Sequence, residues 1–294
     1  MAGTTAAHDH SPTGRSTERT MTSLLEAFHM SQSLARAPHF IKRAIVGSLV
    51  ALVLALGSAP AAFAGGPLAL YFYGPGNNTF VSVPSRTEIS SFADSITVEA
   101  RVYVFNALAR QSIVSKRKDT SGGGGYELRV TPTGKLNFTT FSNTGAVKAS
   151  IDSLVGLPNS NWVHVAGGFD AATGSIWVAV NGAYRSVSAA NGKPAAGTTK
   201  LQLGRSLLTA GATNYLTGYI DNVHVSGVAR YNGNFTPGCY DFDPNTRLLM
   251  RLDQVFLVGS TYMTPASGTG YSALGELGGS GGTVPGLIAG SECY

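Results

Sequence analysis

The chain has few of the residues from which most metal and nucleophilic sites are built. It contains two cysteines in 294 residues, and four of its six histidines lie before residue 40. A zinc site needs several Cys, His or carboxylate ligands at short spacings, and the remaining histidines and the cysteines match no such spacing. His164 and His224 each alternate with valine, as strand residues do, so we expect them to pack or face solvent. We therefore expect neither a transition-metal site nor a catalytic histidine.

Charge is also scarce, since Lys, Arg, Asp and Glu make up 13% of the chain. The first 64 residues hold five of the 21 basic and three of the 16 acidic residues, which leaves 16 basic and 13 acidic residues afterwards. A net charge of about +3 is too weak for nucleic-acid binding, which needs Lys and Arg concentrated on one face. The only basic cluster, Lys116-Arg117-Lys118, precedes Asp119, and we expect it to form a solvated turn.

Paired carboxylates suited to glycoside hydrolysis are missing too. Retaining glycosidases hold two carboxyl groups about 5–5.5 Å apart, so on a strand the pair would be two or four residues apart on one face. Glu99 and Glu127 stand alone on their strands, and Asp241 and Asp243 lie in a connection beside Pro244. No G-x-S-x-G elbow precedes a helix. The sequence therefore predicts a protein that is not an enzyme, with no catalytic residues.

One long apolar run is present, and it lies near the N-terminus. Lys42-Arg43 precede the run Ala44–Leu56, and Ala62-Phe63-Ala64 follow it. A basic start, a short apolar stretch and a small-x-small site are typical of a cleavable signal peptide. The alternative, a membrane anchor, is disfavoured because the run is short for about 30 Å of hydrocarbon. We expect residues 1–64 to be an N-terminal extension with a signal peptide. The protein would then be secreted, periplasmic or at the cell surface, with no stable membrane anchor.

Short alternating apolar runs separated by Gly, Asn and Pro turns dominate the rest of the chain, which favours a β-sandwich or barrel. The clearest window is Asn161–Gly182, in which alternation continues on both sides of the turn Asp170–Gly174 and ends in the hairpin signal Asn181-Gly182. It predicts three consecutive antiparallel strands. Further strands are expected at Leu68–Tyr73, Thr79–Val83, Ser95–Val104, Ser112–Ser115, Tyr126–Val130, Leu136–Phe141, Ala146–Ile151, Lys200–Gly204, Leu216–Ser226 and Arg247–Leu252. Residues 259–294 are rich in Gly and Ser, and we expect a tail of loop or extended polypeptide with no domain of its own.

Five segments in order resemble the laminin-G-like family of concanavalin A-like lectin/glucanase domains. They read LYFYGPGNNTFVSVP, SITVEARVYV, NWVHVAGGFDAATGSIWVAVNG, KLQLGRS and GYIDNVHVSGVARYNGNFTP, followed by the closing strand NTRLLM. Arg101 stands where the family usually has Trp. The resemblance implies an all-β fold, an antiparallel two-sheet β-sandwich of the jelly-roll type over residues 65–258.

The same resemblance implies a structural calcium ion, the one cofactor we expect. The family's site draws on the first hairpin and on the G-x-I-D strand, and the matching residues are Asn77, Asn78 and Asp221. Calcium prefers carboxylate, amide and carbonyl oxygens. Here Tyr73 replaces the family's usual Asp, and amides replace a further acid, so we expect a weaker site.

The resemblance also implies binding of a glycan or of an extracellular or surface protein. Sugar faces stack on aromatic rings, and the candidates are Trp162 and Trp177. Trp177 is out of phase with the apolar face of its strand, so it either faces away from the core toward a ligand or covers a second apolar layer. Two alternatives remain open. One is a glycanase or lyase on the same fold, and the other is a self-associating structural protein of the cell envelope.

The two cysteines, Cys239 and Cys293, predict a disulfide, because an even count in an exported chain favours pairing. The bridge would close a loop of about 55 residues and tether the C-terminal tail, with a stabilisation of ~4 kcal/mol in the loop-entropy model. Peptide mapping without reductant should recover one cross-linked peptide pair, which a reduced sample should lack. Recovery of both thiols in free form would contradict the pairing.

Overall fold

The computed structural model describes residues 68–92, 94–208, 211–268, 271–280, 283 and 285–289. The chain divides at Ala64, and everything described belongs to the unit Gly65–Tyr294. The expected signal peptide lies outside the described residues. Within the described ranges, no helix is both long and apolar enough to cross a membrane.

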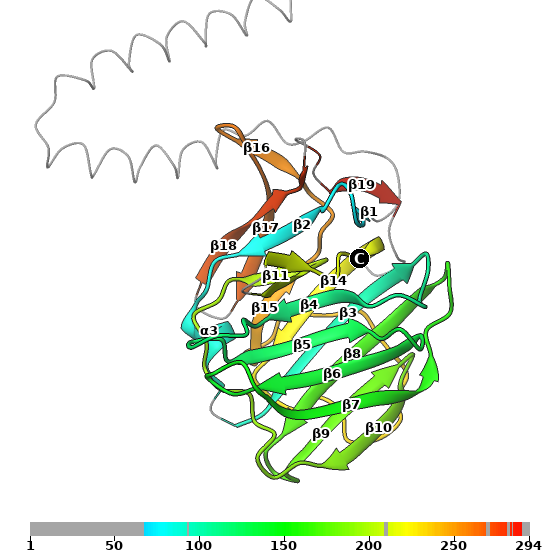
Figure 1. Cartoon of the computed structure of the whole chain (residues 1–294), viewed down its shortest axis with the longest axis vertical. Helices are drawn as coiled ribbons and strands as arrows, with labels where there is room; N and C mark the ends of the chain where they lie inside the picture. Colours follow the sequence, from blue (N-terminus) through cyan, green and yellow to red (C-terminus); the bar gives the residue numbers. More distant parts are fainter. Residues whose placement is uncertain are drawn as a thin grey trace, which may run out of the picture. The chain divides into compact units, whose positions relative to one another are not determined.

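The described chain is built almost entirely of β-strands, as the alternating sequence pattern predicts (Figure 1). The three strands expected in Asn161–Gly182 and just after it are present as β8, β9 and β10. In chain order the elements are β1 Leu68–Tyr73, β2 Phe80–Val83, α3 Thr87–Ser90, β3 Ile96–Val104, β4 Gln111–Lys116, β5 Gly125–Val130, β6 Lys135–Phe141, β7 Val147–Gly156, β8 Trp162–Asp170, β9 Ser175–Val180, β10 Ala183–Ser188, β11 Leu201–Leu203, β12 Ser206–Leu208, β13 Gly211–Thr213, β14 Thr217–Ser226, β15 Thr246–Met250, β16 Phe256–Val258, β17 Thr261–Gly268, β18 Tyr271–Gly278 and β19 Gly286–Ala289.

The strands pair in two antiparallel rows. The first row runs β10–β9–β8–β3–β14, with β1 and β15 both beside β14. The second row runs β7–β6–β5–β4–β11–β2–β18–β17–β16. The two rows are not separate sheets by their hydrogen bonds. The pair Leu249–Ser267 joins β15 of the first row to β17 of the second, so the strands form one 17-stranded sheet.

The hydrophobic core fills the space where the rows face one another. In β3 the residues Ile96, Val98, Ala100, Val102 and Val104 are all fully buried, and they come from alternate positions, as the period of two requires. A direct contact between the rows is made where Phe138 of β6 lies over Gly167 of β8. An added Cβ at Gly167 would be 2.6 Å from the Cβ of Phe138.

Of the two expectations for residues 259–294, loop and extended polypeptide, the loop is wrong for most of the described residues, which form paired strands. β17 and β18 form a hairpin, β18 pairs with β2 through Leu277 and Val81, and β19 pairs with β1 through Leu70 and Leu287. The alternation was hidden because the buried side of β17 consists of small or polar residues such as Thr264 and Ala266. The tail therefore extends both rows.

The expected Cys239–Cys293 disulfide stays a prediction. Cys293 lies outside the described residues, and the part of the chain that the structure describes contains no free cysteine.

The contact between Gly167 and Phe138 gives a test of how the rows pack. Gly167→Ala should lower the free energy of unfolding by about 1–3 kcal/mol, because an extra methyl group in a filled core forces neighbours to move. Urea denaturation measures the change. Gly233→Ala serves as the control, since nothing lies within 4 Å of a Cβ added there. Equal stability of the two variants would contradict the close packing of β6 on β8.

Candidate functional site

A row of aromatic side chains crosses four neighbouring strands of the first row. Tyr71 of β1 pairs with Tyr219 of β14, Tyr219 with Tyr103 of β3, and Tyr103 with Trp162 of β8. Side chains directly opposite each other on paired strands point to the same face. The sequence neighbours of these residues, among them Phe72, are buried in the core, so the aromatic row lies on the face turned away from it.

The rings touch one another along the whole row. The centroid of Tyr219 lies 5.2 Å from that of Tyr71 and 5.1 Å from that of Tyr103, and Tyr103 lies 5.8 Å from Trp162. Tyr73 and Phe105 widen the row, at 4.2 Å from Tyr71 and 5.1 Å from Tyr219 respectively. All of these side chains are half-buried. We call this set the aromatic platform: Tyr71, Tyr73, Tyr103, Phe105, Trp162 and Tyr219.

The platform offers both apolar ring surface and hydroxyl groups. Burial and the neighbouring hydroxyls of Tyr71 and Tyr103 raise the pKa of Tyr219 above its ordinary value of 10.0. The Tyr219 hydroxyl therefore stays protonated at neutral pH and can both donate and accept hydrogen bonds. A surface of this kind suits a ligand that has apolar faces and hydroxyl edges.

Sequence reasoning singled out Trp162 but did not assemble the platform. Tyr103 and Tyr219 stand out of phase with the apolar faces of long alternating strands, just as Trp162 does. The missing information was the order of the strands in the sheet, which brings residues from four distant segments into one register. The role of Trp162 in binding stays a prediction.

The prediction that Trp177 contacts a ligand is wrong, because its side chain is fully buried. The indole stacks on Tyr184 at a centroid distance of 5.6 Å and meets the edge of Tyr231 at 5.8 Å. It does lie on the face turned away from the core, as its phase predicts, but Tyr231 and Phe235 pack against its cluster. A covered ring offers no surface to a sugar.

The structure brings together three residues that the sequence left apart. Glu99 of β3 accepts hydrogen bonds from His164 of β8, at 3.2 Å from Nε2, and from His224 of β14, at 2.9 Å from Nδ1. The Tyr231 hydroxyl donates to the same carboxylate at 2.8 Å. Glu99 and both histidines are buried to within 1% exposure. The expectation that the histidines pack as strand residues is confirmed, with Glu99 as their shared partner.

The electrostatics of this cluster suit a structural role. Burial alone would raise the pKa of Glu99, but the hydrogen bonds and charges of His164 and His224 outweigh it and lower the pKa to about 2. The carboxylate is therefore ionised at all physiological pH values. The segment after β14 covers it, since the ring of Tyr240 lies 5.8 Å from that of His164 and 5.4 Å from that of His224. A substrate has no access to a group sealed in this way.

The three expected calcium ligands do not converge. Asn77 and Asn78 lie in the turn after β1, where the Asn78 amide donates to the Ser280 hydroxyl at 2.9 Å. Asp221 is buried on β14, opposite Arg101 of β3. Thr217, at the start of β14, is already level with the end of β1, and at about 3.3 Å per residue Asp221 lies more than 10 Å further along the strand. The register therefore separates the acid from the amides.

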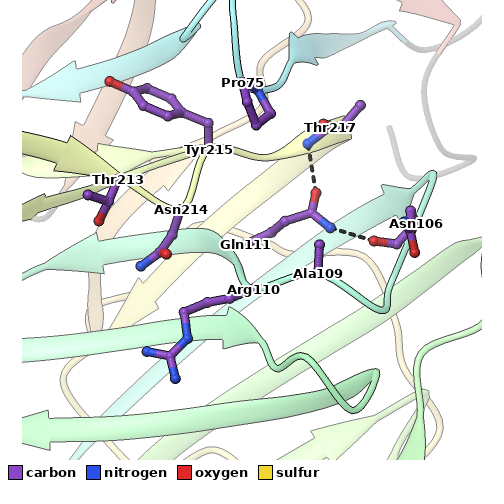
Figure 2. A pocket seen from close by; sticks show the side chains of 9 residues that line it. All are labelled: Pro75, Asn106, Ala109, Arg110, Gln111, Thr213, Asn214, Tyr215 and Thr217. Carbon is purple, nitrogen blue, oxygen red and sulfur yellow. Dashed lines mark hydrogen bonds between the residues drawn. The ribbon is translucent and has the colours of Figure 1, made fainter.

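A pocket of about 610 Å³ opens beside the first turn (Figure 2). Its floor is organised by Gln111, whose side chain accepts a hydrogen bond from the Thr217 amide at 2.7 Å and donates to the Asn106 carbonyl at 2.5 Å. The other lining residues are Pro75, Ala109, Arg110, Thr213, Asn214 and Tyr215. Arg110 is the only charged residue in this lining.

Comparisons with known proteins agree with the fold. A family model described as Laminin_G_3, of the concanavalin A-like lectin/glucanases superfamily, matches residues 75–232. A comparison with curated proteins finds no match.

Solved structures are similar at low identity. A protein from Bacteroides ovatus, itself only proposed to bind carbohydrate, is 20% identical with a TM-score of 0.51, and the match covers 76% of this chain and 60% of that one. A SAP-like pentraxin from Limulus polyphemus is 16% identical with a TM-score of 0.42, over 56% and 78% of the two chains. Mouse laminin α1 domains LG4-5 are 16% identical with a TM-score of 0.43, over 58% and 46%.

The Glu99 cluster predicts a loss of stability in acid. The pKa of Glu99 is about 2 in the folded chain against a reference value of 4.5, so its contribution is present above about pH 4.5 and disappears as the pH falls toward 2. The shift corresponds to roughly 3 kcal/mol. Urea unfolding at several pH values should show Glu99→Gln to be less stable at pH 7 and less dependent on pH below 4.5. Asp94→Asn, at an exposed site, should keep the wild-type profile. A variant and a wild type with parallel profiles would contradict the assignment.

Proposed function

Because the chain belongs to the concanavalin A-like lectin/glucanases superfamily, we propose that it is an exported, non-catalytic module that binds a glycan on its aromatic platform. The observation that carries this proposal is the register of Tyr71, Tyr219, Tyr103 and Trp162 across four adjacent strands on the face turned away from the core. Such a row presents ring surface to solvent without a break.

The chemistry of the platform matches that of a sugar chain. The C–H faces of pyranose rings are apolar and pack on aromatic rings, while their hydroxyls need donors and acceptors at the rim. The phenol groups of Tyr71, Tyr103 and Tyr219 supply both from within the platform itself. Strand backbones hold these residues rigidly, so little side-chain freedom is lost on binding.

The positions of the carboxylates favour binding over hydrolysis. Glu99, Glu127 and Asp221 are each no more than 1% exposed, and Glu99 and Glu127 are held by hydrogen bonds and ion pairs. A glycosidase needs an acid and a second carboxylate on either side of a bound glycosidic bond. Among the described residues, none of these three carboxylates lies open beside the platform. We therefore propose a binding role in preference to a glycanase.

We propose that the protein carries out this binding role after export from the cytoplasm. The basic, apolar and small-residue pattern of residues 42–64 supports a signal peptide, and the pairing of Cys239 with Cys293 would suit an oxidising compartment. We propose that the partner is a polysaccharide or glycoprotein outside the cytoplasm or at the cell surface. The three expected calcium ligands are too far apart for one ion, so the proposal does not depend on calcium.

A glycan array on the purified mature unit, run with calcium and with a chelator, would identify the ligand. Trp162→Ala should then weaken its binding by at least about tenfold, a loss of about 1.4 kcal/mol, because one stacking ring is removed. Titration calorimetry measures the affinity. Tyr262→Ala is the matched control, since Tyr262 is 44% exposed but lies on β17, away from the platform. Unchanged affinity of the Trp162 variant, or an array without any bound glycan, would refute the proposal.

A further inference from the structure

The outward face of the second row carries arginines that the glycan platform does not use. Arg110 precedes β4, Arg117 follows it, and Arg129 lies on the neighbouring strand β5. Positions 110 and 117 differ by an odd number, so in a regular strand their side chains would point to opposite faces. One of the two would then point into the core.

A β-bulge in β4 places both arginines on the same face. Ser112 pairs with Arg129, but Ser115 pairs with Glu127, so the register shifts between Ser112 and Val114. The extra residue, Ile113, is buried in the core. Because of this shift, Arg110 before the bulge and Arg117 after it are both in phase with Glu127 and Arg129. Their side chains therefore point to the same face of the sheet. Bulges commonly occur where a side chain must be redirected toward a functional site.

The cluster holds more positive than negative charge. Arg129 Nη1 lies 2.9 Å from Glu127 Oε2, and Arg117 Nη1 lies 3.8 Å from the same atom. Glu127 is fully buried, and it also accepts a hydrogen bond from the Ser206 hydroxyl. The carboxylate of Glu127 therefore faces two guanidinium groups. Arg110, which is exposed, forms no ion pair within the described part of the chain.

Several hydrogen-bond donors in this region have no partner. The Nε atoms of Arg117 and Arg129 and the hydroxyl of Ser112 are buried and make no hydrogen bond in the described chain. Buried donors of this kind cost free energy unless something satisfies them. The pKa of Arg117 is lowered, mainly by burial and partly by the charges of Arg129 and Arg110, against the opposing charges of Glu127 and Asp119. The three guanidinium groups therefore act on one another across β4 and β5.

The sequence predicted a solvated turn at Lys116-Arg117-Lys118, and this is wrong for Lys116. Its side chain is fully buried on the opposite side of β4 and donates to the Gly197 carbonyl at 3.2 Å and to the Thr199 carbonyl at 2.5 Å. Only Arg117 of the first two residues contributes charge to the outward face. Lys116 therefore has a structural role on the core side of β4, while the Arg117 side chain, which is 13% exposed, lies on the outward face over the ring of Phe141.

We propose that Arg110, Arg117 and Arg129, here called the arginine cluster, bind the carboxylates of an acidic polysaccharide at a second site. Guanidinium groups match planar carboxylates in a forked geometry, which distinguishes this cluster from a set of lysines. The site goes beyond the glycan platform, because it lies on the second row and uses none of the platform residues.

The surroundings favour a sugar polymer over other polyanions. The pocket beside Arg110 is lined by the amides of Asn106 and Asn214 and by the hydroxyl-bearing residues Thr213 and Tyr215, groups that read sugar hydroxyls. Figure 2 shows the Arg110 guanidinium at the edge of this pocket, pointing away from Pro75 and Tyr215. A nucleic acid would need a longer basic track, whereas the rest of the chain carries little excess charge.

The test compares two matched probes, hexagalacturonate and its fully methyl-esterified form, by titration calorimetry at 50 and 500 mM NaCl. The wild-type protein should bind the acid at least about tenfold more tightly than the ester at low salt, and high salt should reduce the difference, as screening requires. Arg110→Gln and the double variant Arg110→Gln/Arg117→Gln should reduce and then abolish the preference. Arg251→Gln, which removes the same charge after β15 in the first row, should leave the preference within about twofold.

Further measurements separate this proposal from the others. Arg110 is exposed, so its variant should keep the wild-type melting temperature and report on binding alone. Trp162→Ala should leave hexagalacturonate binding intact, so the arginine cluster and the platform succeed or fail independently. Equal affinity for acid and ester, or an acid preference that survives the double variant, would overturn the inference. Equally tight binding of an oligothymidylate with the same charge would also overturn it, because the site would then recognise phosphate polymers.

Discussion

The pairing of β3 with β8 on one side and β14 on the other is the constraint on which the rest of this protein depends. β8 pairs with β3 in one register, whereas the pairing of β14 with β3 shifts by one residue at a bulge between Asp221 and His224. With these pairings Val98 and its alternate neighbours enter the core. Tyr103 meets Trp162 and Tyr219, and Glu99 lies between two histidines. A shift of one residue would turn each of these side chains to the other face. Core, platform and buried cluster therefore share one physical origin.

The face turned away from the core is divided into an open and a closed part. Toward one end of the strands, Tyr71, Tyr103 and Trp162 remain half-exposed. Further along β3, and on β9, the segment after β14 covers Glu99 and Trp177 with rings such as Tyr231. The ion pair between Arg230 and Asp243, at 2.6 Å, helps to hold that segment. The hydrogen bonds of Glu99 thus help to hold the segment after β14 in place. On this face of the first row, the aromatic platform is the part that this segment leaves open to a ligand.

Much of the fold could be predicted from the sequence, because alternation and turn residues are local signals. The strands of Asn161–Gly182 and the burial of Val163 and Val165 are as expected. The strand β17 was missed because its buried positions, such as Thr264 and Ala266, carry small or polar residues. The Glu99 cluster and the platform were missed for another reason. Each joins residues far apart in the chain, and only the order of the strands brings them together.

The bulge at Ile113 determines whether Arg110 and Arg117 lie on the same face of β4. Arg110 and Arg117 are seven positions apart, and this odd spacing places them on one face only because the bulge takes up one residue. A relative that lacks that residue would reach the same face with a regular strand, because its spacing would be even. A relative that keeps the odd spacing in a regular strand would turn one of the two arginines inward. Among relatives, the spacing of the two arginines is therefore informative about the charged face only together with the presence or absence of the bulge.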